Sequence, residues 1–293
     1  MHRHVLHNDD ILDAHVKHVS SGQTGLMNGW GVFSTLRVAD GVLFAFERHW
    51  ARMHRDAVRL HVPFPDEPDY LKSRLLKLIE ANDARNATLR VAVVRNHGGP
   101  FEGPDIDRAF DVIAFTTSLA AWGDSVSLAI KAHGRHAQNE FAGAKVMSWA
   151  QNLTWYEEAH ELGFDEMLLL NERGEVSECT SANIFIAEGS RVLTPPLTSG
   201  CLPGVTRELL LEEIRAGGLS IHERTLLPAD LEQADEVFIT SSTRDLLPVR
   251  LIQGLQIKHR GDATEVLRQA LAGFRETYVR EHAGLQPEAV YNR

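Results

Sequence analysis

Cysteine and long apolar runs are both scarce in this sequence. Only 2 of its 293 residues are cysteines, Cys179 and Cys201, which is too few for a disulfide framework. No run approaches the ~20 apolar residues that a membrane-spanning helix needs, and the start of the chain, from Met1 to His7, lacks the apolar stretch of a signal peptide. We therefore expect a cytoplasmic protein with no membrane partner.

An excess of positive charge is also missing. The 30 Lys and Arg residues are outnumbered by 40 Asp and Glu residues, which gives a net charge of -10. Nucleic acids are bound by clusters of basic residues, and no such patch occurs here. His2, His4 and His7 could suggest a metal site, but a flexible terminus offers no fixed geometry, so we expect no metal. The expected partner is a small molecule.

Helical and strand-like patterns alternate along the chain. The length allows one or two domains, and 43% hydrophobic residues are enough for a sizeable core. Residues 120–125 are predicted to connect an N-terminal domain, 1–119, to a C-terminal domain, 126–293. The spacing of apolar residues predicts helices over 46–60, 69–81, 147–162 and 262–282, and strands over 32–38, 42–46, 89–94, 110–115, 126–130 and 165–170. The fold class is therefore a mixed α+β fold in two domains.

Two residues, Lys145 and Glu178, indicate the chemistry. A lysine amine can form a Schiff base with an aldehyde cofactor, and a carboxylate beside a pyridine nitrogen keeps that ring protonated as an electron sink. Together they favour a pyridoxal phosphate enzyme. Lys-Glu pairs at this spacing also arise by chance in a chain with this many charges, so the surrounding sequence has to decide.

Distinctive segments lie on both sides of this pair. They are Gly31-Val-Phe-Ser-Thr-Leu-Arg37, His49-Trp-Ala-Arg-Met53, Asn183-Ile-Phe-Ile186, Leu193-Thr-Pro-Pro196, Leu202-Pro-Gly-Val-Thr-Arg207 and Ala234-Asp-Glu-Val-Phe-Ile-Thr-Ser-Ser-Thr243. In their order and their residues they resemble the class IV aminotransferases, the family of branched-chain aminotransferases, D-amino acid transaminases and aminodeoxychorismate lyases. The resemblance runs from about Gly29 to Pro248. It implies fold type IV, pyridoxal 5'-phosphate (PLP) between the domains, and a homodimer.

A phosphate site is expected where a turn precedes a helical run. Pro203-Gly-Val-Thr206 leads into an amphipathic segment, so the backbone amides of Val205 and Thr206 should lie at a helix N-terminus, which attracts anions. An ordinary helix cap is the alternative. The resemblance implies that this turn holds the cofactor phosphate together with Ser242 and Thr243, and that Arg52 supplies the charge. Arg52 lies among other basic residues, where a solvated helix face is the alternative.

The substrate-binding residues are less well defined. Phe33 stands where some relatives have a tyrosine in the substrate pocket, and Ser34 stands where many have an acidic residue. Arg37 shares a strand face with Phe33 and is a candidate for binding a carboxylate, with a structural ion pair as the alternative. The resemblance implies that the glycine-rich loop starting at Arg95 contributes carboxylate-binding side chains. Either Arg95 or His97 takes that role, or the substrate lacks the usual carboxylate, and a plain connecting loop is the alternative.

The resemblance leaves three functions to compare. In a transaminase, Lys145 would carry the cofactor and then, as a free amine, move the proton between substrate and cofactor, while an amino group passes from a branched-chain or similar amino acid to a 2-oxo acid. Glu178 would hold the ring nitrogen protonated. The alternative is a lyase that releases pyruvate and 4-aminobenzoate from aminodeoxychorismate. The third, a cofactor-binding protein without activity, is disfavoured because the catalytic set is present.

Overall fold

The computed structural model describes residues 1–100 and 106–283, which group into two units by their contacts. Unit 1 contains Met1–Ala120, Lys145–Ser148 and the residues from Arg275 onward, and unit 2 contains Ala121–Ala144 and Trp149–Phe274. The chain passes from unit 1 to unit 2 within the segment expected to connect two domains. It also returns briefly to unit 1 at Lys145–Ser148, a short excursion that local sequence patterns do not signal.

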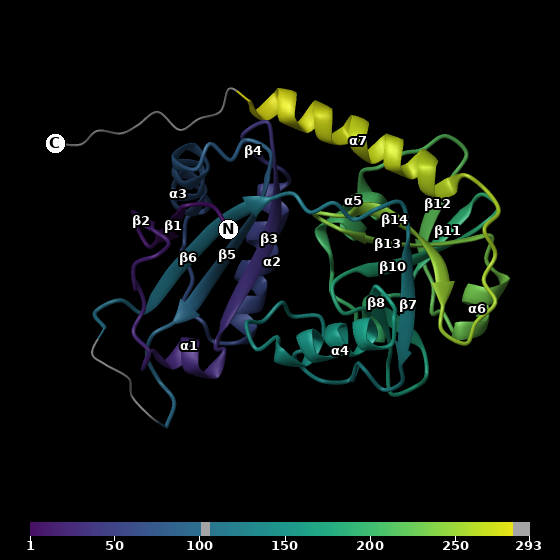
Figure 1. Cartoon of the computed structure of the whole chain (residues 1–293), viewed down its shortest axis with the longest axis horizontal. Coiled ribbons are helices and arrows are strands. Elements are labelled where there is room, and N and C mark those ends of the chain that lie inside the picture. Colours follow the sequence, from purple (N-terminus) through teal and green to yellow (C-terminus); the bar gives the residue numbers. More distant parts are fainter. Residues whose placement is uncertain (101–105, 284–293) are drawn as a thin grey trace. The chain divides into compact units, whose positions relative to one another are not determined.

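Unit 1 is built on a six-stranded antiparallel sheet with the order β2-β1-β6-β5-β3-β4 (Figure 1). The strands are β1 (His4–His7), β2 (Asp10–Asp13), β3 (Gly31–Ala39), β4 (Val42–Leu43), β5 (Ala87–Arg95) and β6 (Phe110–Ser118). Asp40 and Gly41 have φ angles of 49° and 85°, which suit the two-residue turn expected between β3 and β4. The second strand of that hairpin is shorter than expected, because Ala45 adopts a left-handed conformation and starts a helix.

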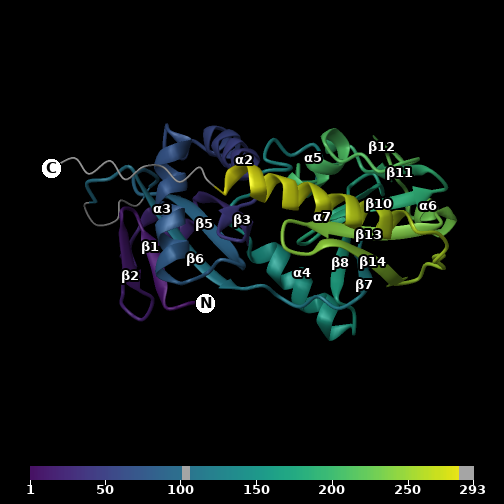
Figure 2. The ribbon, with the colours of Figure 1, turned by 90° about the horizontal axis from the view of Figure 1, so that it is seen from above.

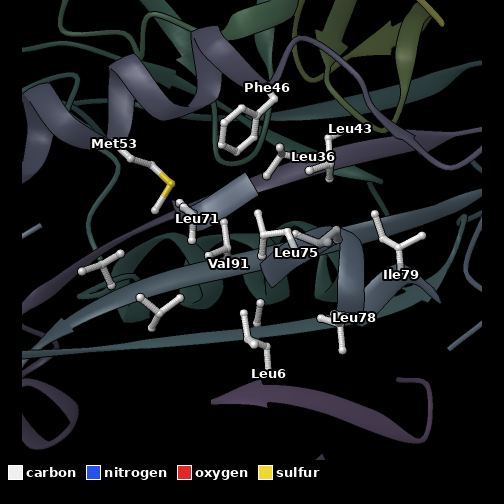
Figure 3. Packing of buried hydrophobic residues seen from close by; sticks show 14 of the residues in the cluster. Leu6, Leu36, Leu43, Phe46, Met53, Leu71, Leu75, Leu78, Ile79 and Val91 are labelled. Atoms are coloured by element: carbon white, nitrogen blue, oxygen red, sulfur yellow. The ribbon is translucent and has the colours of Figure 1, made fainter. Parts of the chain in front are cut away.

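Two helices cover one face of this sheet. They are α2 (Phe46–Arg59) and α3 (Pro68–Ala81), which lie side by side, while the short α1 (Thr24–Asn28) contacts β5 (Figures 1 and 2). Their apolar residues, spaced by three and four positions, meet the inward residues of the strands. Figure 3 shows this core, with Phe46 and Met53 from α2, Leu71, Leu75 and Leu78 from α3, and Leu6, Leu36 and Val91 from the sheet.

Unit 2 contains an eight-stranded mixed sheet with the order β12-β11-β10-β13-β14-β7-β8-β9. The pairs β11-β12, β14-β7 and β7-β8 are parallel and the other pairs antiparallel. The strands are β7 (Val126–Lys131), β8 (Glu166–Leu170), β9 (Val176–Cys179), β10 (Asn183–Glu188), β11 (Arg191–Thr194), β12 (Ser220–Glu223), β13 (Glu236–Ser241) and β14 (Asp245–Ile252). The stacked rings of Phe185 and Phe238, with centroids 5.1 Å apart, join β10 to β13.

The helices of unit 2 pack on this sheet. Helix α4 (Ala150–Glu161) contacts β7 and β8, and α5 (Val205–Glu212) contacts β12 and β13. The other helices are the 3₁₀ turn η1 (Leu197–Ser199), α6 (Pro228–Gln233) and α7 (Ala263–His282), whose residues divide between the two units after Phe274. Among the residues that the structure describes, no helix combines the length and the apolar character needed to cross a bilayer. The mixed α/β fold predicted from the sequence is confirmed.

Candidate active site

The Lys145 segment is held as a short extra strand on β3. The Phe33 N–H donates to the Lys145 carbonyl oxygen at 3.2 Å, and the Met147 N–H donates to the Gly31 carbonyl oxygen at 2.9 Å. β5 occupies one edge of β3, and β4 covers the other edge only at Val38 and Ala39. The open part of that edge accepts residues 145–147. For this reason α4 starts at Ala150 and not at residue 147 as expected.

The Lys145 side chain lies against an aromatic ring that also contacts an arginine. Lys145 Nζ is 4.6 Å from the centroid of the buried Phe33 ring, and the Arg90 guanidinium carbon is 4.0 Å from the same centroid. Arg90 of β5 pairs directly with Thr35, which shares a strand face with Phe33. Burial lowers the pKa of Arg90. Arg90 is not among the site residues predicted from the sequence, although the pairing of β3 with β5 would have placed it here.

Arg52 is buried, so the alternative of a solvated helix face does not apply to it. It is 4% exposed, and its Nη2 donates to Ser34 Oγ at 2.7 Å. Ser34 Oγ lies 2.7 Å from Nδ1 of His49, which is buried one turn earlier on α2. Burial, followed by the charges of Arg52 and Lys145, holds the pKa of His49 well below its usual value. The imidazole is therefore neutral near pH 7.

Ser34 Oγ lies within hydrogen-bond distance of both Arg52 and His49. Ser34 Oγ accepts a hydrogen from Arg52 and has a single hydrogen of its own to donate. We assign that hydrogen to His49 Nδ1, which leaves the imidazole proton on Nε2. Ser34 and His49 thus orient a buried guanidinium, a group suited to binding phosphate.

Glu178 lies at the end of β9, in unit 2, and both of its carboxylate oxygens accept hydrogen bonds. The residue is 6% exposed. Arg135 Nε donates to Oε1 at 2.9 Å, and the Leu202 N–H donates to Oε2 at 3.1 Å. This carboxylate is therefore buried, oriented and next to the turn that leads into α5, unlike the exposed charge that often ends a strand.

The expected anion site is a helix N-terminus with no side-chain cap. Gly204 is the N-cap of α5 and has no side chain with which to cap the first amides of the helix. The Asn183 amide donates to the Leu202 carbonyl oxygen at 2.8 Å and thereby fixes the turn. Val205 and Thr206 are both buried. The amides predicted to bind phosphate thus begin a helix, and α5 packs on β13.

Ser242 and Thr243 form the connection between β13 and β14. Thr240 Oγ1 donates to the Asp245 carbonyl oxygen at 2.7 Å across the base of this turn. The next residue, Arg244, pairs with the buried Glu166 carboxylate at 3.0 Å. The turn is therefore anchored at both ends, as a binding loop with a fixed shape requires.

Arg95 and His97 lie at the beginning of the loop predicted to bind a carboxylate. Arg95 Nε donates to the His97 carbonyl oxygen at 2.5 Å, Nη1 donates to the His61 carbonyl oxygen, and the guanidinium lies 4.3 Å from the centroid of the Trp30 ring. These contacts shape the loop. Arg37 is half-buried on the face of β3 that carries Phe33. The carboxylate roles of all three residues stay predictions.

Sequence comparison identifies the family. The sequence model of the amino-transferase class IV family matches residues 31–252. This chain belongs to the class IV aminotransferases. Members of the family use PLP, and this chain is a PLP-dependent transaminase.

Similar proteins include transaminases with different substrates. A putative branched-chain-amino-acid aminotransferase of Methanocaldococcus jannaschii is 28% identical over 92% of this chain and 95% of its own length. A D-alanine aminotransferase of Bacillus licheniformis is 27% identical over 86% of this chain and 89% of its own length.

Solved structures share the fold over nearly the whole chain. Branched-chain amino acid aminotransferase of Escherichia coli has a TM-score of 0.86 at 24% identity and covers 100% of this chain and 98% of its own. A PLP-bound hypothetical aminotransferase of Mycobacterium tuberculosis has a TM-score of 0.83 at 25% identity and covers 94% of this chain and 99% of its own. These likenesses confirm the predicted fold type IV.

Proposed function

We propose that this transaminase moves the amino group of a branched-chain or similar amino acid to a 2-oxo acid. The name of the Methanocaldococcus jannaschii relative supports this substrate class, and the two relatives described above are both transaminases. That similarity favours amino transfer over the elimination of pyruvate. We also propose that the working assembly is a homodimer, which sedimentation or light scattering of the purified protein would test.

The residues present fit PLP, and we propose a role for each. Lys145 would attach the cofactor aldehyde, and Arg52 would bind the phosphate together with the amides of Val205 and Thr206 and the Ser242–Thr243 turn. Glu178 would receive the N–H of the ring. The fit depends on a buried guanidinium that two neighbours orient and on a buried carboxylate held at both oxygens. When bound, the cofactor supplies an electron sink for the negative charge that develops at substrate Cα.

Lys145 is the proposed base at substrate Cα. Its amine lies at the face of the buried Phe33 ring, and its backbone is fixed on β3. A free lysine amine held in this way can take the proton from substrate Cα and return it to the carbon on the other side of the amino nitrogen, without a second acid or base. The neutral His49 next to Arg52 adds no positive charge there. Replacement of Lys145 should therefore abolish turnover while leaving the phosphate contacts in place.

Arg90 is the proposed partner of a substrate carboxylate. Its guanidinium and the Lys145 amine both lie against the Phe33 ring, so an anion bound by Arg90 would keep a substrate close to the amine. A partly desolvated cation also gains more from an anion than a solvated one does. Its position on the same ring as the Lys145 amine favours Arg90 over Arg95, whose guanidinium lies on the Trp30 ring.

Borohydride reduction of the PLP-loaded protein tests this function directly. The label should attach to the peptide that contains Lys145, and Lys145→Ala should lose the label and nearly all turnover. A label on another lysine would overturn the assignment. A panel of L- and D-amino acids with 2-oxo acid acceptors then identifies the substrate. Release of pyruvate from aminodeoxychorismate without an acceptor would favour the lyase instead.

A further inference from the structure

A buried carboxylate contacts the backbone of the proposed catalytic lysine. Asp56, on α2, is 0% exposed. Its Oδ2 accepts the Lys145 backbone N–H at 2.9 Å, and its Oδ1 accepts two hydrogen bonds from Arg55, at 3.2 Å and 2.9 Å. Burial of a charge is costly unless it is paired and hydrogen-bonded. Both conditions hold here, and one of the partners is the residue that carries the chemistry.

We propose that Asp56 is a positioning residue that fixes the backbone of Lys145 so that its amine points to the reacting atoms. The proposal rests on the function proposed above, in which Lys145 attaches the cofactor. Phe33 binds the carbonyl oxygen of Lys145 and Asp56 binds its N–H, so both polar backbone groups of the lysine are held. With the backbone fixed, the position of Nζ depends only on the side-chain torsions of Lys145.

The same face of α2 carries the proposed phosphate-binding residue. His49, Arg52 and Asp56 are all buried and follow one another by three and four positions, which places them on one helix face. Arg52 and Asp56 are four residues apart, about 6 Å along the helix axis. One rigid helix thus holds the cation for the phosphate and the anchor for the lysine, and it sets the spacing between them.

The alternative is a structural role, in which Asp56 only pairs with Arg55. Three variants separate the two roles. Asp56→Ala removes the acceptor, Asp56→Asn keeps a neutral acceptor oxygen, and Arg55→Gln removes the guanidinium but leaves the contact with Lys145. Asp111→Ala is the matched control, because Asp111 is also a buried carboxylate of unit 1 and accepts a hydrogen bond from Asn8 at 2.9 Å.

Amide hydrogen exchange of the cofactor-free protein measures the contact between Asp56 and the Lys145 N–H, and it does not depend on catalysis. In Asp56→Ala the Lys145 amide should exchange about ten- to a hundredfold faster than in the parent chain, as expected for a lost hydrogen bond to a charged group. Asp56→Asn should show a smaller increase. Arg55→Gln and Asp111→Ala should leave the rate unchanged relative to the Met147 amide. If Asp56→Ala does not fold, Asp56→Asn and Arg55→Gln still decide, since equal acceleration in both would refute the proposal.

A second readout separates this proposal from the function on which it rests. Asp56→Ala should lower kcat and slow borohydride labelling of Lys145, while the cofactor dissociation constant stays close to that of the parent, because the phosphate contacts remain. Unchanged labelling and unchanged amide exchange in Asp56→Ala would overturn the positioning role. Absence of the Lys145 label in the parent chain would instead overturn the proposed function, whatever the exchange data show.

Discussion

Cofactor retention should depend strongly on Arg52. Replacement by alanine removes a buried guanidinium whose Nη2 donates to Ser34 Oγ at 2.7 Å and which is the proposed cation for the phosphate. A hydrogen bond to a charged group contributes about 1.5–3 kcal/mol, and each 1.4 kcal/mol is roughly a tenfold change in affinity. The PLP dissociation constant of Arg52→Ala should therefore rise about ten- to a hundredfold.

The rate of the chemical step should change much less than the affinity. Phosphate contacts are the same before and during the reaction, so their loss weakens binding without raising the barrier from the bound state. Saturating PLP should restore most of kcat in Arg52→Ala. Ser34→Ala, which removes the group that orients the guanidinium, should show the same pattern in weaker form.

Equilibrium dialysis and a PLP titration of activity provide the assay. Arg85→Ala is the control, because Arg85 is an exposed arginine of the same unit whose Nη2 donates to the Asp40 carbonyl oxygen at 3.2 Å. It should bind PLP like the parent chain. If Arg52→Ala also binds PLP like the parent, the phosphate is held elsewhere, and the buried guanidinium serves only the stability of α2.

Three further replacements test other parts of the site. Glu178→Gln keeps the shape of the side chain but removes the charge proposed to hold the ring nitrogen protonated, so kcat should fall by about 10²-fold or more; parent-like activity would mean that another residue serves that nitrogen. Arg90→Gln should raise KM for amino acid substrates more than for amines without a carboxylate, and equal effects on both would exclude carboxylate binding by Arg90. His49→Gln should flatten the loss of stability in acid, measured by urea unfolding across pH. Burial keeps the pKa of His49 below the ordinary value of 6.5, so in acid the unfolded chain binds a proton that the folded chain does not. The free energy of unfolding therefore decreases as pH falls below about 6.5, by up to roughly 1.4 kcal/mol per pH unit.

Local patterns predicted the helices and the long strands of unit 1. The apolar spacing in α2 and α3 and the Asp40-Gly41 turn are properties of neighbouring residues, and the structure agrees with them. The strands β1 and β2, of four residues each, are too short to stand out in sequence. The start of the helix expected over 147–162 was wrong, because the residues before Ala150 pair with β3 instead of forming a helical turn.

For the site too, single residues could be predicted from the sequence, whereas contacts between residues far apart in the chain could not. Lys145 and Glu178 were proposed from the sequence because they are of the residue types that PLP chemistry requires. The residues that contact Lys145 and Glu178 could not be recognised from the sequence, because they come from distant parts of the chain. Arg135, 43 positions before Glu178, binds its carboxylate, and Asp56, 89 positions before Lys145, binds its backbone.

The burial of Arg52 was the property of the site that was hardest to predict from the sequence. Arg52 lies on a helix with several basic neighbours, and by composition it belongs on a solvated face. It is nevertheless only 4% exposed, and its guanidinium donates a hydrogen bond to Ser34 Oγ on β3. A carboxylate at that position would pair with Arg52 and compete with a phosphate for the same donors. With a hydroxyl at Ser34, and with His49 held neutral beside it, these two neighbours add no formal charge next to the guanidinium.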